Sequence, residues 1–100
     1  MFIALVDFHV APENRDTALS ALQGEATTVR AMPGCRTFRP HCDPDSGTHV
    51  GVVHEWDSAD AFGAYVASPG FADSGKLLRP MMTQPPSSRR YSAELIEDVK

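Results

Sequence analysis

Apolar side chains recur at every second position near the start of the chain, which is the pattern of a β-strand. The predicted strand covers residues 2–10, and one of its faces is entirely apolar: Phe2, Ala4, Val6, Phe8 and Val10. The opposite face carries Ile3 and Leu5 beside polar residues. A strand with one solvated face alternates more strictly than this, so we expect both faces of this strand to be covered.

The alternation returns over residues 48–56 and gives way at once to helical spacing. One face of the strand predicted over residues 48–56 carries Val50, Val52, His54 and Trp56. Asp57 or Ser58 can cap a helix that we predict over residues 58–67. One side of this helix is apolar or aromatic: Phe62, Tyr65 and Val66. A strand that ends in Trp and leads directly into a capped helix places the indole under that helix, where it can line a cavity.

Helical periodicity and chain breaks predict the other elements. A helix is expected over residues 12–32, because apolar residues recur in it at spacings of three and four: Leu19, Leu22, Ala26 and Val29. Pro33-Gly34 ends this helix. The remaining segments are a strand over residues 35–42, a short helix over 71–78, a loop over 81–88 and a last strand over 90–97.

The order β-α-β-β-α-β predicts a ferredoxin-like α+β fold with a four-stranded antiparallel sheet. Right-handed crossovers place both helices on one face of this sheet. The other face then exposes an apolar patch: Ile3, Leu5, Val53 and Ile96. Because closed two-fold dimers are the commonest assemblies, we predict a homodimer that forms through this face of the sheet.

Size and charge exclude several classes of protein. We expect the 100 residues to form one domain, residues 1–100, with 42% hydrophobic and 22% charged residues, as in ordinary globular proteins. A net charge of −4 and the lack of a basic run argue against nucleic acid and anionic membranes as partners. The adjacent pair Arg89 and Arg90 is interpreted as a solvated strand end. No apolar stretch approaches the roughly 20 residues that cross a bilayer, and Asp7 interrupts any signal peptide, so a cytoplasmic protein is expected.

Metal and disulfide chemistry is not predicted. Cys35 and Cys42 would lie roughly 23 Å apart on one strand and face opposite sides, so we expect two free thiols. A turn region contains residue types that bind metals: His41, Cys42, Asp43, Asp45 and His49. Their spacing matches no compact zinc or calcium pattern, and a polar hairpin turn explains them.

Several short motifs together resemble the antibiotic biosynthesis monooxygenase (ABM) superfamily. The matching residues are Pro33-Gly34, Glu55-Trp56-Asp57-Ser58, Phe62, Ser68 and Phe71, and the resemblance covers nearly the whole chain. It implies a dimeric α+β barrel. It does not by itself assign a reaction, since this superfamily includes polyketide oxidases, quinol monooxygenases, haem degraders and members without known activity.

An alignment on Glu55-Trp56 compares the chain with each branch of that superfamily. The haem-degrading branch uses Asn, Trp and an axial His where this chain has Val6, Tyr65 and Gly75, so no haem cofactor is expected. This chain is similar to the anthrone-oxidising branch in having Trp56 where that branch has Trp. Its Asn, Tyr and Arg fall on Val52, Phe62 and Lys76, which removes two of its polar groups and exchanges one cation. The quinol branch tends to carry His at the position of Tyr65.

Candidate site residues follow from the predicted strand and helix. His54 is the candidate general base and Tyr65 the hydrogen-bond donor; they are the predicted catalytic pair. Trp56 is the candidate wall for an aromatic substrate. The alternative for both His54 and Trp56 is a role in the core. The remaining predicted substrate-binding residues are Val52, Phe62, Lys76, Arg79 and Met81; the two cations can steady an oxyanion or be solvated.

The resemblance and these residues predict a monooxygenase-like protein that oxidises a phenolic, anthrone or quinol-type aromatic with O₂. Such a substrate reduces oxygen itself once deprotonated, so neither metal nor flavin is expected as a cofactor. Two alternatives stay open: a non-catalytic dimeric module that binds a hydrophobic metabolite, and an isomerase or cyclase acting on a polyketide intermediate.

Overall fold

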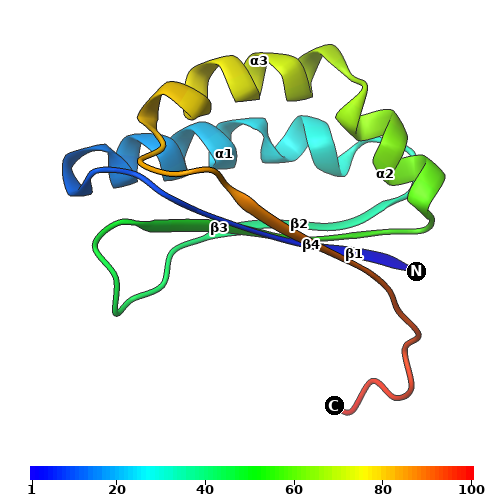
Figure 1. Ribbon diagram of the computed structural model, residues 1–100. Coiled ribbons are helices and arrows are strands. Elements are labelled where there is room, and N and C mark those ends of the chain that lie inside the picture. The colour runs from blue at the N-terminus through cyan, green and yellow to red at the C-terminus, as the bar shows by residue number, and fades with distance from the viewer.

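The computed structural model, which describes residues 1–100, has one four-stranded antiparallel sheet with all its helices on one face (Figure 1). This confirms the predicted ferredoxin-like α+β fold. The elements are β1 (Phe2–His9), η1 (Pro12–Asn14), α1 (Arg15–Arg30), β2 (Cys35–His41), β3 (His49–Trp56), α2 (Ala59–Val66), α3 (Pro69–Leu78), η2 (Arg79–Met81) and β4 (Ser87–Ser92). No helix is long and apolar enough to cross a membrane.

The sheet has the strand order β2-β3-β1-β4, so β1 lies between β3 and β4. Ala4 on β1 is paired with His54 on one side and with Arg90 on the other. His54 is also paired with Phe38 of β2. These four residues therefore form one row across the sheet, and because paired residues share a face, the row points toward the helices.

Local sequence determines where the helices begin and end. Gly34 follows α1 with a φ of +83°, a left-handed conformation that favours glycine, and a Cβ at this position would lie 2.7 Å from that of Ala61. Ser58 is the cap of α2 and accepts a hydrogen bond from the amide of Ala61. Asp57, the other candidate cap, is instead paired with Arg36. Ser68 caps α3 in the same way as Ser58 caps α2.

The core lies between the helices and the sheet. It contains fourteen buried apolar residues, among them Trp56, Phe38, Val10 and Val50 as the largest fully buried side chains. The buried side of α1 consists of Ala18, Leu22, Ala26 and Val29. Leu19, which the spacing placed in this group, is only half-buried.

The last strand differs from its prediction. It runs from Ser87 to Ser92 rather than over residues 90–97. The physical reason is the register with β1: Phe2 pairs with Ser92, so strand pairing ends where β1 begins, and beyond it Met1 and Ala93 exchange the last two hydrogen bonds. Residues beyond this point leave the sheet on the face opposite the helices (Figure 1).

The strand register also changes the composition of the uncovered face. Ile96 is 95% exposed in the C-terminal segment and does not lie on the sheet, so its predicted place in the apolar patch was wrong. Tyr91 takes that place, because it pairs with Ile3 on the same face. Ile3, Leu5 and Val53 lie there as predicted, and no helix covers them (Figure 1).

The predicted turn between β2 and β3 is held by its own polar groups. The Asp43 amide donates to Nδ1 of His49, and the Asp45 amide donates to the Asp43 carboxylate, each over 2.9 Å. Nε2 of His49 lies 2.7 Å from the Asp7 carboxylate. No group of three or more His, Cys, Asp or Glu side chains in the chain could hold a metal ion. Both cysteines are free.

Candidate active site

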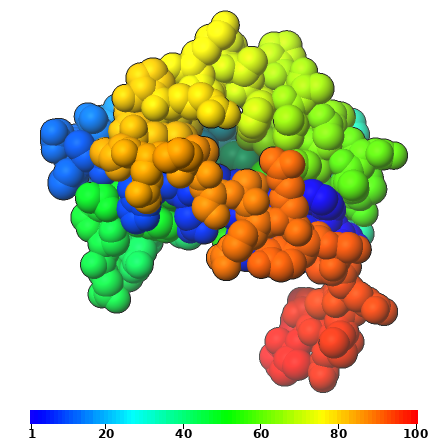
Figure 2. Space-filling model, viewed as in Figure 1, coloured from blue at the N-terminus to red at the C-terminus, as the bar shows by residue number.

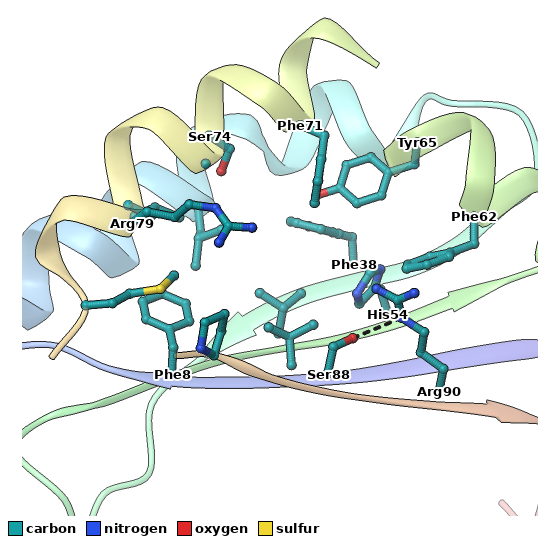
Figure 3. Close-up of a pocket in the computed structure, with 17 residues that line it drawn as sticks. Phe8, Phe38, His54, Phe62, Tyr65, Phe71, Ser74, Arg79, Ser88 and Arg90 are labelled. Carbon is teal, nitrogen blue, oxygen red and sulfur yellow. Dashed lines mark hydrogen bonds between the residues drawn. The ribbon is translucent and has the colours of Figure 1, made fainter. Parts of the chain in front are cut away.

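A cavity of about 190 Å³ lies between the sheet and the helices α2 and α3. Seventeen residues line it, and ten of them are hydrophobic (Figure 3). Figure 2 shows its mouth as a hollow between α3 and the edge strand β4. The floor is the face of the sheet that carries His54 and Arg90.

Ala4 explains why the imidazole and the guanidinium reach the same space. It is fully buried and stands between His54 and Arg90 in the row across the sheet. Its methyl group leaves room above β1 that a larger side chain would fill. Arg90 extends over the ring of Phe62, with its Cζ atom 4.9 Å from the ring centre, and its guanidinium lies beside His54 (Figure 3).

His54 is held by a hydrogen bond from Trp56. The indole nitrogen donates to Nδ1 of His54 over 2.9 Å, within a buried cluster of aromatic rings. An indole nitrogen can only donate, so Nδ1 must be the unprotonated nitrogen and the neutral ring carries its proton on Nε2. Nε2 has no hydrogen-bond partner within the protein. Because every fully buried polar side-chain atom of the chain does have a partner, Nε2 is not fully buried, and it faces the open space of the cavity.

The environment of His54 favours a hydrogen-bond donor over a base. Burial, together with the smaller effect of the Arg90 charge, lowers the pKa of His54 to about 4. A ring with this pKa stays neutral at physiological pH, and its available nitrogen offers a proton rather than a lone pair. The core role and the site role predicted for His54 are therefore combined in one side chain.

The low pKa of His54 has a measurable effect on stability. Below pH 6.5 the unfolded chain takes up a proton at His54, but the folded chain does so only near pH 4, so acid stabilises the unfolded state. Between pH 7 and pH 4 we expect this group to remove about 3 kcal/mol of unfolding free energy. His54→Asn keeps an acceptor for the indole and should lose that part of the pH dependence. Urea unfolding of the wild type and of His54→Asn at pH 7 and pH 4 measures this contribution to the unfolding free energy. The same pH dependence in both proteins would contradict the lowered pKa of His54.

Trp56 lies in the core and does not line the cavity. It is 0% exposed and its ring stacks on that of Tyr65, with centres 5.3 Å apart. Its contribution to the site is indirect, since it fixes the orientation and the proton position of His54. The predicted role as a substrate wall does not fit this position. The cavity is lined by Tyr65 and Phe62 from α2, whereas the indole is buried and does not line it.

Tyr65 presents its hydroxyl to the cavity, where it points toward Phe71 and Phe38 (Figure 3). It has no hydrogen-bond partner within the protein, so it is free to bind a ligand. Burial raises the pKa of Tyr65, and the charges of Glu25 and Cys35 raise it further. The phenol therefore stays protonated and can donate a hydrogen bond; its role toward a substrate stays a prediction.

The remaining predicted site residues divide into two groups. Val52, Phe62 and Arg79 line the cavity with His54 and Tyr65. The side chain of Arg79 runs along α3 past Gly75, where a Cβ would lie 3.6 Å from its Nε. Its guanidinium points into the cavity (Figure 3).

Lys76 and Met81 do not line the cavity. The side of α3 that faces it carries Ser74, Gly75 and Leu78, so helical geometry turns the exposed Lys76 away. Met82 lines the cavity in place of its neighbour Met81.

The most important residue that the sequence analysis missed is Arg90. Together with Arg89 it was interpreted as a solvated strand end, but a strand directs neighbouring side chains to opposite faces. The correct start of β4 at Ser87 would have placed Ser88 and Arg90 on the same face as His54. Other lining residues that were not singled out for the site are Phe8, Leu22, Phe38, Ser74, Leu78, Pro86 and Ser88.

The fold and the cavity together define a small α+β protein with an enclosed apolar site under its second and third helices. The sequence profile of the antibiotic biosynthesis monooxygenase family matches residues 1–76. The chain therefore belongs to the antibiotic biosynthesis monooxygenase family. No protein of curated function matches it significantly.

Solved structures share the fold over nearly the whole chain. A candidate antibiotic biosynthesis monooxygenase from Deinococcus radiodurans is similar at 20% identity, covering 100% of this chain and 99% of its own, with a TM-score of 0.90. Rv0793 from Mycobacterium tuberculosis is similar at 21% identity, with 98% of each chain covered and a TM-score of 0.85. At such identities the likeness establishes the fold. The family match ends before Arg79, Ser88 and Arg90, so it does not extend to these lining residues.

The polar groups of the cavity include several hydrogen-bond donors and no carboxylate. Nε2 of His54, the Tyr65 hydroxyl and the guanidinium groups of Arg79 and Arg90 are donors, and none of the lining residues is Asp or Glu. An apolar space with several donors and two cations stabilises an anionic oxygen. The family fold and this cavity make the chain a monooxygenase-like or small-molecule-binding protein.

Proposed function

We propose that this chain is a cofactor-independent monooxygenase acting on a small phenolic or quinol-type aromatic. The observation that carries the proposal is an apolar cavity whose polar lining includes two guanidinium groups, the Nε2–H of His54 and the Tyr65 hydroxyl but no carboxylate. A flat apolar ring suits the walls made by Phe8, Phe38 and Phe71, while a phenolate oxygen suits the donors of His54 and Arg90. Such a site lowers the pKa of a bound phenol by favouring its anion.

The proposed reaction takes its electrons from the substrate. A bound quinol anion reacts with O₂; one oxygen atom forms a new bond to a ring carbon, the ring is oxidised to a quinone, and the other oxygen atom leaves as water. The substrate supplies all four electrons, so the balance needs no further reductant. The protein would bind the anion, keep water out and stabilise the charge that develops on oxygen.

Cavity size narrows the proposed substrate. A cavity of about 150 Å³ is known to hold benzene, so the present 190 Å³ suits one substituted aromatic ring. A tricyclic anthrone would have to extend through the mouth between α3 and β4. We therefore propose a single-ring quinol or phenol as the substrate class, with a homodimer formed through the uncovered face of the sheet.

Oxygen uptake tests the proposed activity. With a substituted hydroquinone, the protein should consume oxygen well above the autoxidation rate and form the hydroxylated quinone, whereas an anthrone should react more slowly. No product is expected under strict anaerobiosis. Tight binding of the quinol without uptake would instead identify a binding module, and product formed without oxygen would identify an isomerase or cyclase.

A further inference from the structure

Glu25 is a half-buried carboxylate that the proposed chemistry has not yet used. It lies on α1, and its Oε1 accepts a hydrogen bond from the hydroxyl of Ser74 on α3 over 3.3 Å. Leu22, three residues earlier on α1, lines the cavity, so Glu25 follows on the same side of that helix. The carboxylate itself does not line the cavity, but Ser74 does.

Ser74 connects the cavity to this carboxylate. Its hydroxyl points from α3 into the cavity (Figure 3) and donates its proton to Glu25. A serine oxygen that donates one hydrogen bond keeps two lone pairs with which it can accept another. A phenol bound below α3 can therefore donate to Ser74 while Ser74 donates to Glu25.

We propose that Ser74 and Glu25 form a proton relay that removes the phenolic proton from the cavity; the relay rests on the proposed function. The substrate O–H bond breaks as its proton moves to Ser74 Oγ, and the Ser74 proton moves to Glu25 Oε1. The products are a phenolate in the cavity and a neutral Glu25, with no electrons transferred. Glu25 then returns the proton to solvent, to which it is partly exposed.

The relay supplies what the cavity lacks. No carboxylate lines the cavity, and His54 offers Nε2–H rather than a lone pair, so none of the lining residues is a base at neutral pH. Burial raises the pKa of Glu25 above its usual value, and the hydrogen bond from Ser74 offsets this rise only in part. Glu25 is therefore a better proton acceptor than a solvated carboxylate.

The test separates proton transfer from binding and from oxygen chemistry. Para-nitrophenol serves as the probe, because its phenolate is coloured, and a temperature jump measures how fast the bound phenol ionises without oxygen. Glu25→Gln and Ser74→Ala should each slow this step about tenfold or more, while the double variant is no slower than either single one. Ser74→Thr, which keeps a hydroxyl, should retain the rate, and Glu13→Gln is the charge-matched control.

Equilibrium titration distinguishes a relay from a structural role. Glu25→Gln removes a negative charge near the anion and should tighten phenolate binding about twofold or more, while the control Glu13→Gln leaves it unchanged. Unchanged ionisation rates in both Glu25→Gln and Ser74→Ala, or weaker binding with a lower melting temperature, would overturn the relay. A wild-type protein that ionises the probe through the relay but consumes no oxygen with a quinol would overturn the monooxygenase activity alone.

Discussion

Arg90→Gln is expected to weaken binding of a phenolate by about 10- to 100-fold, because it removes a charge-assisted hydrogen bond worth about 1.5–3 kcal/mol. The guanidinium lies over the ring of Phe62 beside His54, where it can contact an anion bound in the cavity. Titration with para-nitrophenol at a pH where it is ionised measures the change. The pKa of His54 should rise in the same variant, since Arg90 contributes to its depression.

The neighbouring arginine is a closely matched control for this prediction. Arg89→Gln changes the net charge by the same amount, but Arg89 lies on the opposite face of β4, where it pairs with Leu5. It should leave phenolate binding nearly unchanged, because the sheet lies between this side chain and the cavity. Equal loss in both variants would mean that net charge, rather than the position of Arg90, governs binding.

Val53→Asp is expected to convert a dimer into monomers or unfolded chains. Val53 lies on the uncovered face of the sheet between Leu5 of β1 and Arg39 of β2. In a sheet-to-sheet dimer the carboxylate that Val53→Asp introduces would be buried without a partner, which costs several kcal/mol. Sedimentation of the wild type should give twice the chain mass of 10.9 kDa, and that of the variant should not.

Leu77→Asp provides the control for charge alone. Leu77 is 51% exposed on α3, on the far side of the molecule from the sheet face, so the same new charge should leave the assembly unchanged. A dilute, folded wild-type monomer would rule out the two-sheet arrangement.

Much of the fold could be predicted because its determinants are local. Alternating residues in β1 and β3, the break at Pro33-Gly34 and the cap at Ser58 each specify one element through short-range geometry. The boundaries of β4 could not be predicted in this way. They depend on where β1 begins, which is a long-range pairing between Phe2 and Ser92 that no periodicity within residues 87–97 reveals.

The site was predictable only in part, for a related reason. His54, Phe62 and Tyr65 belong to one strand and the helix that follows it, so their common direction could be read from spacing. Arg90 and Ser74 reach the cavity through pairing with β1 and through packing of α3 on α1. The hydrogen bond from Trp56 leaves the proton of His54 on Nε2. It depends on the rotamers of these two side chains, which a strand pattern does not specify.

The position of β4 at the edge of the sheet couples ligand binding to local order. This strand is hydrogen-bonded to β1 alone, and all six of its residues are exposed, so it belongs to the part of the fold that opens most easily. It also carries Ser88 and Arg90, one wall of the cavity. An anion held by Arg90 therefore stabilises the closed strand, and fluctuations that release the strand also release the ligand.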